Sequence, residues 1–156
     1  CYYYICRMSV NIKNRKANFE YQFISTFIAG ICLLGTEIKS IRNNQANISD
    51  AYCFFSDKEL YVKNLHISEY PNGGYANHEP KRNRKLLLNK QELHKILRKV
   101  KEKGNSIIPI RLFINESGIA KLEIALGKGK KIHDKRESIK AQDQKRDLDQ
   151  IKNNRK

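Results

Sequence analysis

The stretch that decides the fold is "SIIPIRLFINESGIAKLEIAL", residues 106–126. Two apolar runs flank the polar turn "NESG" at 115–118, a pattern typical of a β-hairpin. Side chains of a strand point alternately to its two faces, so every second residue of each run is expected to face a core, with Arg111 and Lys121 facing outward. The predicted core residues are Ile108, Ile110, Leu112, Ile114, Leu122, Ile124 and Leu126.

Further strands are predicted on the N-terminal side of this hairpin. Residues 50–67, "DAYCFFSDKELYVKNLHI", contain two β-rich runs around a polar turn at 56–58 and indicate a second hairpin. The alternating "FEYQF" at 19–23 and the apolar "GICLL" at 30–34 also favour strands. A small closed or partly open antiparallel β-barrel is the simplest way to bury these faces without long free edges.

Two segments have the period of helices. The first, "GTEIKSIRNN" at 35–44, is expected to be a short helix with Thr36 as its N-cap. The second, residues 89–104, begins with the capping pair Asn89 and Glu92. It ends at Gly104, which is expected to stop the helix. Between the second hairpin and this helix lies a long loop, "SEYPNGGYANHEPKR", at 68–82.

Positive charge is concentrated in two segments. The 156 residues carry a net charge of +15, with 31 Lys and Arg against 16 Asp and Glu. Residues 81–103 hold ten basic residues against two acidic ones, and residues 128–156 hold eleven against five. Segregation of this kind favours a polyanionic partner, foremost a nucleic acid and then an anionic membrane surface.

The chain is expected to form one folded domain, residues 11–131, between two less ordered ends. Residues 1–10 form a predicted disordered extension. The tail, 132–156, has three large apolar residues besides its first position, which are too few to offset the entropy of ordering. In "LGKGKKIHDKR" at 126–136, Gly127 and Gly129 are expected to end the last strand and act as a hinge.

No chemistry of its own is expected for this chain. The four histidines fit no zinc spacing, and no serine or cysteine stands in a recognisable nucleophile motif, so neither catalytic nor metal-binding residues nor a cofactor are predicted. The four cysteines are interpreted as reduced, buried thiols. No apolar run is long enough to span a membrane or to form a signal peptide, which predicts a cytoplasmic protein, expected to be a monomer.

Four motifs in this sequence resemble the small protein B family, the SsrA-binding proteins of bacteria. They are "NRKANFEYQFI", "AGICLLGTEIKSIRNNQANISDAY", "NHEPKRNRKLLLNKQEL" and "AKLEIALGKGKKIHDKR", in the family's order and spacing. The resemblance implies a mainly β fold: an oligonucleotide-binding-type antiparallel barrel with flanking helices and a tail that becomes helical only on the ribosome. It also implies a non-enzymatic adaptor that brings transfer-messenger RNA (tmRNA) to stalled ribosomes.

The resemblance also implies a division of the functional residues between barrel and tail. Those expected to meet the tRNA-like domain of tmRNA are Asn14, Arg15, Lys16, Tyr21, Glu37, Lys39, Ser40, Arg42, Asn77, His78, Arg82, Arg84, Lys85, Lys121 and Lys128. Those expected to meet the decoding region and mRNA channel of the ribosome are Lys130, Lys131, His133, Asp134, Lys135, Arg136 and Ile151.

The sequence departs from the family pattern at three positions. Ile28 stands where many members have a glutamate, Gly127 replaces a usual alanine, and Gln144 occupies a position that is aromatic in some members. Two other interpretations remain open. One is a generic structured-RNA or ribosome-associated protein without a dedicated tail function, and the other is an RNA-processing enzyme that would use His78, Glu79 and Lys81.

Overall fold

The structure is a computed structural model that describes residues 10–131 and residue 139. The strands are β1 (Asn11–Lys13), β2 (Tyr21–Ile31), β3 (Ala46–Asn47), β4 (Tyr52–Ser56), β5 (Glu59–Lys63), β6 (His66–Ile67), β7 (Arg84–Leu87), β8 (Asn105–Ile114) and β9 (Ala120–Gly129). The helices are α1 (Arg15–Glu20), α2 (Gly35–Arg42), the 3₁₀ turn η1 (Gly74–Ala76) and α3 (Lys90–Val100).

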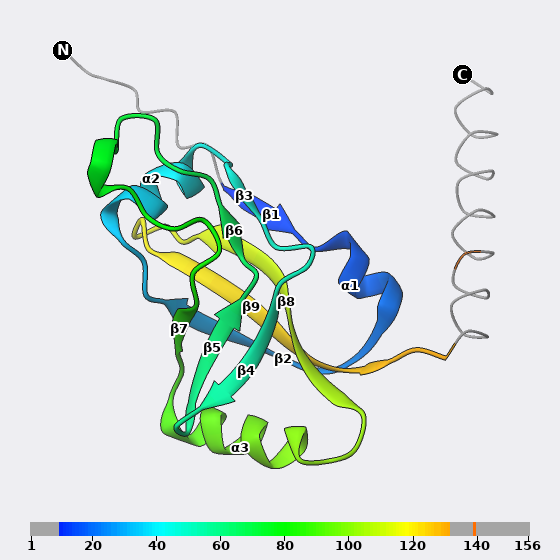
Figure 1. The fold of residues 1–156 in the computed structure, drawn as a ribbon. Coiled ribbons are helices and arrows are strands. Elements are labelled where there is room, and N and C mark those ends of the chain that lie inside the picture. Colours follow the sequence, from blue (N-terminus) through cyan, green and yellow to red (C-terminus); the bar gives the residue numbers. More distant parts are fainter. Residues whose placement is uncertain (1–9, 132–138, 140–156) are drawn as a thin grey trace, which may run out of the picture.

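Within residues 10–131, six antiparallel strands close into a barrel (Figure 1). Their order is β8, β4, β5, β7, β2 and β9, and the pairing of β9 with β8 completes the ring. The short strand β1 pairs with β8 outside this ring, and β3 pairs with β6 in a separate small ladder. The prediction of a mainly β fold built on a small barrel is confirmed.

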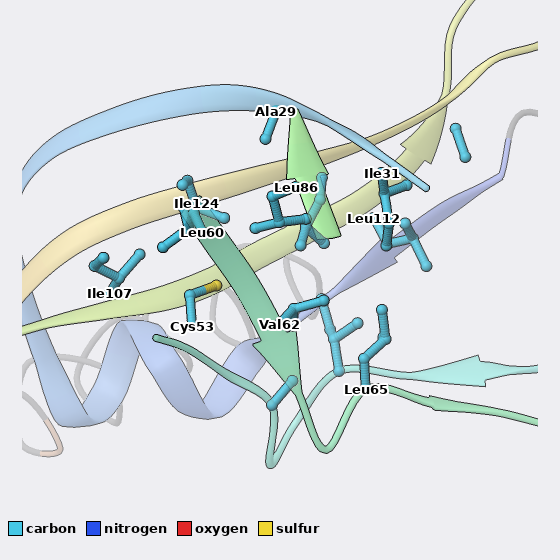
Figure 2. Packing of buried hydrophobic residues seen from close by; sticks show 14 of the residues in the cluster. Ala29, Ile31, Cys53, Leu60, Val62, Leu65, Leu86, Ile107, Leu112 and Ile124 are labelled. Carbon is cyan, nitrogen blue, oxygen red and sulfur yellow. The ribbon is translucent and has the colours of Figure 1, made fainter. Parts of the chain in front are cut away.

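The barrel is filled by apolar side chains from every strand of the ring, which are aliphatic except for Cys53 and the aromatic rings packed around the core. Leu60 of β5, Leu86 of β7 and Ile124 of β9 lie close together in the interior (Figure 2), and each is at most 1% exposed. Ile96 of α3 is equally buried, so this helix closes one end of the barrel with its apolar stripe. Val10 is also buried, and the folded unit therefore includes one residue of the predicted extension.

The hairpin that decides the fold forms as predicted, with one irregularity. β8 and β9 pair along nearly their whole length, and Leu122, Ile124 and Leu126 face the core. A register shift between Pro109 and Arg111 interrupts the alternation of β8. Ile110 is only half-buried, and Ile107, which was not among the predicted core residues, lies in the core with Leu112. A bulge of this kind lets a strand bend at a barrel corner.

The hairpin at 50–67 is also confirmed, and its turn has the expected geometry. β4 and β5 pair in register from Tyr52 opposite Lys63 to Ser56 opposite Glu59. Asp57 and Lys58 both have positive φ, as a two-residue type I′ turn requires.

Two local predictions about helices and strands are wrong. The strand expected from Phe19 begins at Tyr21, because Asn14 starts a short helix: its Oδ1 accepts from the N–H of Ala17. The N-cap of α2 is Leu34 rather than Thr36, and the Leu34 N–H donates to Glu37 Oε2 at 2.7 Å. The start of α3 at Asn89 is confirmed, with Glu92 Oε2 accepting from the N–H of Asn89.

The predicted end of the last strand at Gly129 is confirmed, whereas Gly127 lies inside β9 and does not end it. Strand β9 continues to Gly129, which pairs with Tyr21 of β2. A Cβ on Gly127 would lie 3.3 Å from both Gln22 O and Tyr21 Cβ, so this glycine permits close packing of the two strands. Lys130 extends the contact further, because its N–H donates to Glu20 O at 2.9 Å.

The two cysteines within the described residues lie in different environments. Cys53 is buried in the core as predicted, and burial raises the pKa of its thiol. Cys32 is exposed at the end of β2, contrary to the prediction. Both are free thiols.

Candidate nucleic-acid interface

Basic side chains gather at the end of the barrel that carries α2. We define the α2 cluster as Lys39, Arg42, Arg82 and Lys121. Lys121 lies opposite Gly30, where β2 ends and the chain turns toward α2, and Arg42 lies beside Gly118 in the β8–β9 turn. Three segments that are distant in sequence, α2, the loop before β7 and β9, thus bring positive charge to one end of the barrel (Figure 1).

A buried ionic network fixes this end of the barrel. Glu37 on α2 is fully buried and accepts hydrogen bonds from two arginines. Arg82 reaches both carboxylate oxygens, with Nη2–Oε2 at 2.6 Å and Nε–Oε1 at 2.8 Å. Arg84 donates from Nε to Oε1 at 2.8 Å and also donates to the carbonyls of Leu65 and Pro80. The network therefore joins α2 to β7 and to the loop that precedes it.

The charges of this network persist at neutral pH. Burial acts to raise the pKa of Glu37, but hydrogen bonds from Arg82 and from the Leu34 N–H, with the charge of Arg84, hold it below its ordinary value. Burial lowers the pKa of Arg84, but a guanidinium stays protonated in proteins. Hydrogen bonds to Glu37 fix the position of the Arg82 guanidinium. The Arg82 side chain is still 27% exposed, so part of it remains accessible to a ligand.

The loop between β6 and β7 is attached to α2 through His78 and is closed on itself through Asn77. His78 is 4% exposed, and its ring nitrogens lie 2.9 Å from Thr36 Oγ1 and 3.1 Å from Ile67 O. Asn77 holds Tyr70 through both backbone groups: its Nδ2 donates to Tyr70 O at 2.8 Å and its Oδ1 accepts from Tyr70 N at 3.1 Å. Both ring nitrogens of His78 therefore have protein partners, and the buried ring ties the base of the loop to α2 and to β6.

A second basic group surrounds α1 and the end of β9. We define the α1 cluster as Arg15, Lys16, Lys128 and Lys130. Lys130 Nζ donates to Asn18 O at 3.1 Å, and Lys128 lies opposite Gln22 at the start of β2. Lys128 lies seven residue steps after Lys121, which is roughly 23 Å of strand, so the two clusters mark opposite ends of the β2–β9 ladder.

Exposed apolar residues lie between the clusters, and the sequence analysis did not predict them as part of the site. Ile24 and Ile28 on β2 are 50% and 55% exposed, and Leu87 on β7 is 51% exposed. A Cβ on Gly30 would lie 3.3 Å from Leu87 Cβ, so the glycine lets β7 pack closely here. The alternation of β2 identifies the outward position of Ile28, but apolar residues at such positions are hard to recognise as functional in a single sequence.

The predicted RNA-binding residues separate into scaffold and surface. Five are at most 4% exposed, which excludes direct contact in this conformation and corrects their predicted role: Asn14, Glu37, Ser40, His78 and Arg84. Asn14 donates to Ile48 O and Pro109 O, each at 3.1 Å, and so ties α1 to the barrel. The remaining ones are partly or fully exposed: Arg15, Lys16, Tyr21, Lys39, Arg42, Asn77, Arg82, Lys85, Lys121 and Lys128.

Several of these exposed cations already have protein partners. Lys85 Nζ lies 2.6 Å from Glu59 Oε1, and Lys16 Nζ lies 3.3 Å from Asp50 Oδ1. Lys39 Nζ lies 5.2 Å from the centre of the Tyr70 ring. Surface ion pairs are weak, so a phosphate can compete for these side chains.

The predicted tail residues fall in two groups. Lys130 and Lys131 are described and extend from the end of β9. His133, Asp134, Lys135, Arg136 and Ile151 lie outside the described residues, as does Gln144.

Within residues 10–131, no three His, Cys, Asp or Glu side chains are placed to hold a metal ion. No helix in the described part of the chain is long and apolar enough to cross a membrane.

Comparisons with known proteins agree with one another. The family model "SmpB protein" matches residues 11–154. The SsrA-binding protein of Bacteroides thetaiotaomicron is 58% identical over 140 residues, 90% of this chain and 93% of that protein. The SsrA-binding protein of Anaplasma marginale is 46% identical over 144 residues, 92% of this chain and 97% of that protein.

A solved structure extends the likeness to three dimensions. A chain from the structure described as "tmRNA-SmpB: a journey to the center of the bacterial ribosome" is 43% identical, with a TM-score of 0.67 over 79% of this chain and 86% of that one. The family match, the relatives and this structure all identify the same family: the chain belongs to the SmpB family.

Proposed function

We propose that this protein is a non-enzymatic RNA-binding adaptor that binds tmRNA and brings it to stalled ribosomes for trans-translation. The observation that carries the proposal is membership of the SmpB family along nearly the whole chain. The relatives are named SsrA-binding proteins, and the similar solved chain comes from a structure of tmRNA and SmpB on the bacterial ribosome. A partner of translating ribosomes acts in the cytoplasm, where we place this protein, as a monomer.

The described surface suits the recognition of folded RNA. Proteins read folded RNA mainly through its shape, its phosphates and its 2′-hydroxyls, which requires cations held at fixed positions on a rigid scaffold. The buried pairing of Glu37 with Arg82 and Arg84 supplies such rigidity at the α2 cluster. We assign this end of the barrel, with the apolar patch of Ile28 and Leu87, to the tRNA-like domain of tmRNA.

The tail is the second surface of the proposed adaptor. We assign residues from Lys131 onward, with His133, Lys135 and Arg136, to the decoding region, and Ile151 to anchoring a tail helix in the mRNA channel. A basic segment that orders only on its target can thread into a channel before it folds. A generic RNA-binding protein, the competing interpretation, would need no such division between barrel and tail.

Binding to the tRNA-like domain is expected to depend steeply on salt. With roughly five phosphates neutralised, the logarithm of the association constant should fall with the logarithm of salt concentration with a slope of about −4. Fluorescence anisotropy with labelled RNA at 50 to 300 mM salt measures the slope. A flat response would contradict an interface built on the exposed lysines and arginines.

Single cations of the α2 cluster are expected to contribute to RNA binding and not to folding. Arg42→Ala and Lys121→Ala should each weaken binding by about 1 kcal/mol or more, because charge-assisted contacts to phosphate are lost. Thermal unfolding should be nearly unchanged, since exposed charges stabilise the fold little. Lys63→Ala is the matched control, because this exposed lysine lies on β5, across the barrel from β9. Equal effects in all three variants would contradict the location of the interface.

A further inference from the structure

Tyr75 is the most exposed large hydrophobic side chain in the described part of the molecule. It lies in η1, at the tip of the loop between β6 and β7, with a relative accessibility of 106%. Figure 1 shows this turn projecting beside α2. An aromatic side chain has a large apolar surface to bury, and here none of it is buried against the protein.

The loop that carries Tyr75 is closed by specific contacts. Besides the two bonds between Asn77 and Tyr70, the Gly73 N–H donates to Tyr70 O at 2.8 Å. A Cβ on Gly73 would lie 2.8 Å from the Asn77 side chain, and Gly74 has a φ of +54°, so both glycines are needed for this closure. The segment from Tyr70 to Asn77 is therefore held closed by its own hydrogen bonds.

The closed loop is held next to the α2 cluster. Lys39 lies over the Tyr70 ring, and buried His78 ties the base of the loop to Thr36 of α2. The exposed charges nearest in sequence are Glu69, Glu79 and Lys81. With Lys39, Arg42 and Arg82 added from the cluster, the surroundings of the loop carry a net positive charge.

We propose that the loop is a rigid platform that presents the Tyr75 ring for stacking on an unpaired nucleobase of a folded RNA. This inference rests on the proposed function, in that the partner is RNA. Every base has an apolar face that stacks on an aromatic ring, and the adjacent cations would hold the phosphates that flank it. A ring carried on a backbone that is fixed before binding loses less entropy on contact than a ring carried on a mobile loop.

Asn77 has a positioning role in this arrangement. The sequence resemblance implied that Asn77 itself meets RNA, whereas its amide is engaged with Tyr70 at both ends. The residue that the loop offers to a ligand is Tyr75, whose side chain is fully exposed.

The first test is a set of loop variants titrated with the tRNA-like domain RNA of a bacterial tmRNA and with ribosomes. Tyr75→Ala should weaken binding of at least one of these partners about tenfold, and Tyr75→Phe should bind as the wild type does. Asn72→Ala, an exposed polar residue of the same loop, is the matched control and should have no effect. Wild-type affinity of Tyr75→Ala for both partners would overturn the proposal.

A double-mutant cycle separates presentation from direct contact. If Asn77 only positions Tyr75, then Asn77→Ala should add little once Tyr75 is already alanine, because the two changes remove the same interaction. Independent contacts with RNA would instead give additive losses, which would overturn the positioning role of Asn77.

The second test reports stacking itself. The chain contains no tryptophan, so Tyr75→Trp introduces a single fluorescent reporter. Quenched emission and protection from acrylamide on adding the tRNA-like RNA would show that the stacked base belongs to that RNA. The same change only on adding ribosomes would show that the stacked base belongs to ribosomal RNA. Unchanged emission with both, while the protein still binds RNA, would overturn the proposal. Failure of the wild type to bind either partner would instead overturn the proposed function, and this inference with it.

Discussion

Replacing Glu37 by glutamine is expected to lower the free energy of unfolding by about 3 kcal/mol or more. The carboxylate is fully buried and balances the equally buried guanidinium of Arg84. Removing one partner of a buried ion pair leaves an uncompensated charge in the interior, which costs far more than loss of a surface pair. Urea denaturation of the two proteins followed by circular dichroism measures the difference.

Glu59→Gln is the matched control for this change. Glu59 also pairs with a basic residue, Lys85, but both side chains are substantially exposed. Its denaturation midpoint should be nearly that of the wild type. Similar midpoints for both variants would contradict the structural importance of the Glu37 network. Because Glu37 also orients Arg82, its variant should bind RNA more weakly at temperatures where it is still folded.

The pH dependence of stability gives a second measure of the same network. The folded-state pKa of Glu37 lies below its ordinary value of 4.5. A carboxyl group of this kind stabilises the fold fully above the unfolded-state pKa, and the contribution is lost as the pH falls through the folded-state pKa. The difference in unfolding free energy between wild type and Glu37→Gln should therefore narrow as the pH falls below 4.5.

A chain that ends after Lys131 is expected to bind the tRNA-like domain within a few-fold of wild type and to lose nearly all activity in ribosome rescue. The described barrel, with both basic clusters, ends at this residue, so its RNA-binding surface should remain intact. The removed residues include His133, Lys135, Arg136 and Ile151, which we assign to the decoding region and channel, and only Lys131 of that assignment is retained. Alanine transfer and template switching on ribosomes stalled without a stop codon are the measurements.

Ile151→Asp tests the same assignment without removing charge-bearing residues. It should reproduce part of the loss of rescue, because it places a charged group at the position that we propose as an apolar anchor of the tail. Ser138→Asp, which introduces the same residue at a polar position, is the comparison and should have a smaller effect. Rescue by the truncated chain at the full-length rate would contradict the tail assignment.

Patterns with a local physical cause could be predicted from the sequence. Alternating apolar residues around "NESG" and around residues 56–58 predicted both hairpins, because side-chain alternation and turn residues are local properties of a strand. Asn89 and Glu92 marked the start of α3 for the same reason. The bulge at Ile110 could not be predicted, since it reflects closure of the whole barrel.

The site was predicted less completely, because burial is a tertiary property. Glu37, Arg82 and Arg84 were all predicted to contact RNA, but the two arginines, more than 40 positions away in sequence, bind the buried Glu37 carboxylate. Asn14 and His78 are polar residues in a basic, loop-rich context, which favours a surface role. Their hydrogen bonds to Ile48 and Ile67 appear only when the barrel is closed.

The central claim, that this protein is a tmRNA adaptor, is tested most directly by sequencing the RNA crosslinked to it in its native cells. The account predicts one dominant small RNA species with a tRNA-like end and an internal reading frame, together with small-subunit ribosomal RNA from the decoding region. The Arg42→Ala and Lys121→Ala double variant should lose the first more than the second. A broad mixture of cellular RNAs with no enriched tmRNA would contradict the claim and favour a generic RNA-binding protein.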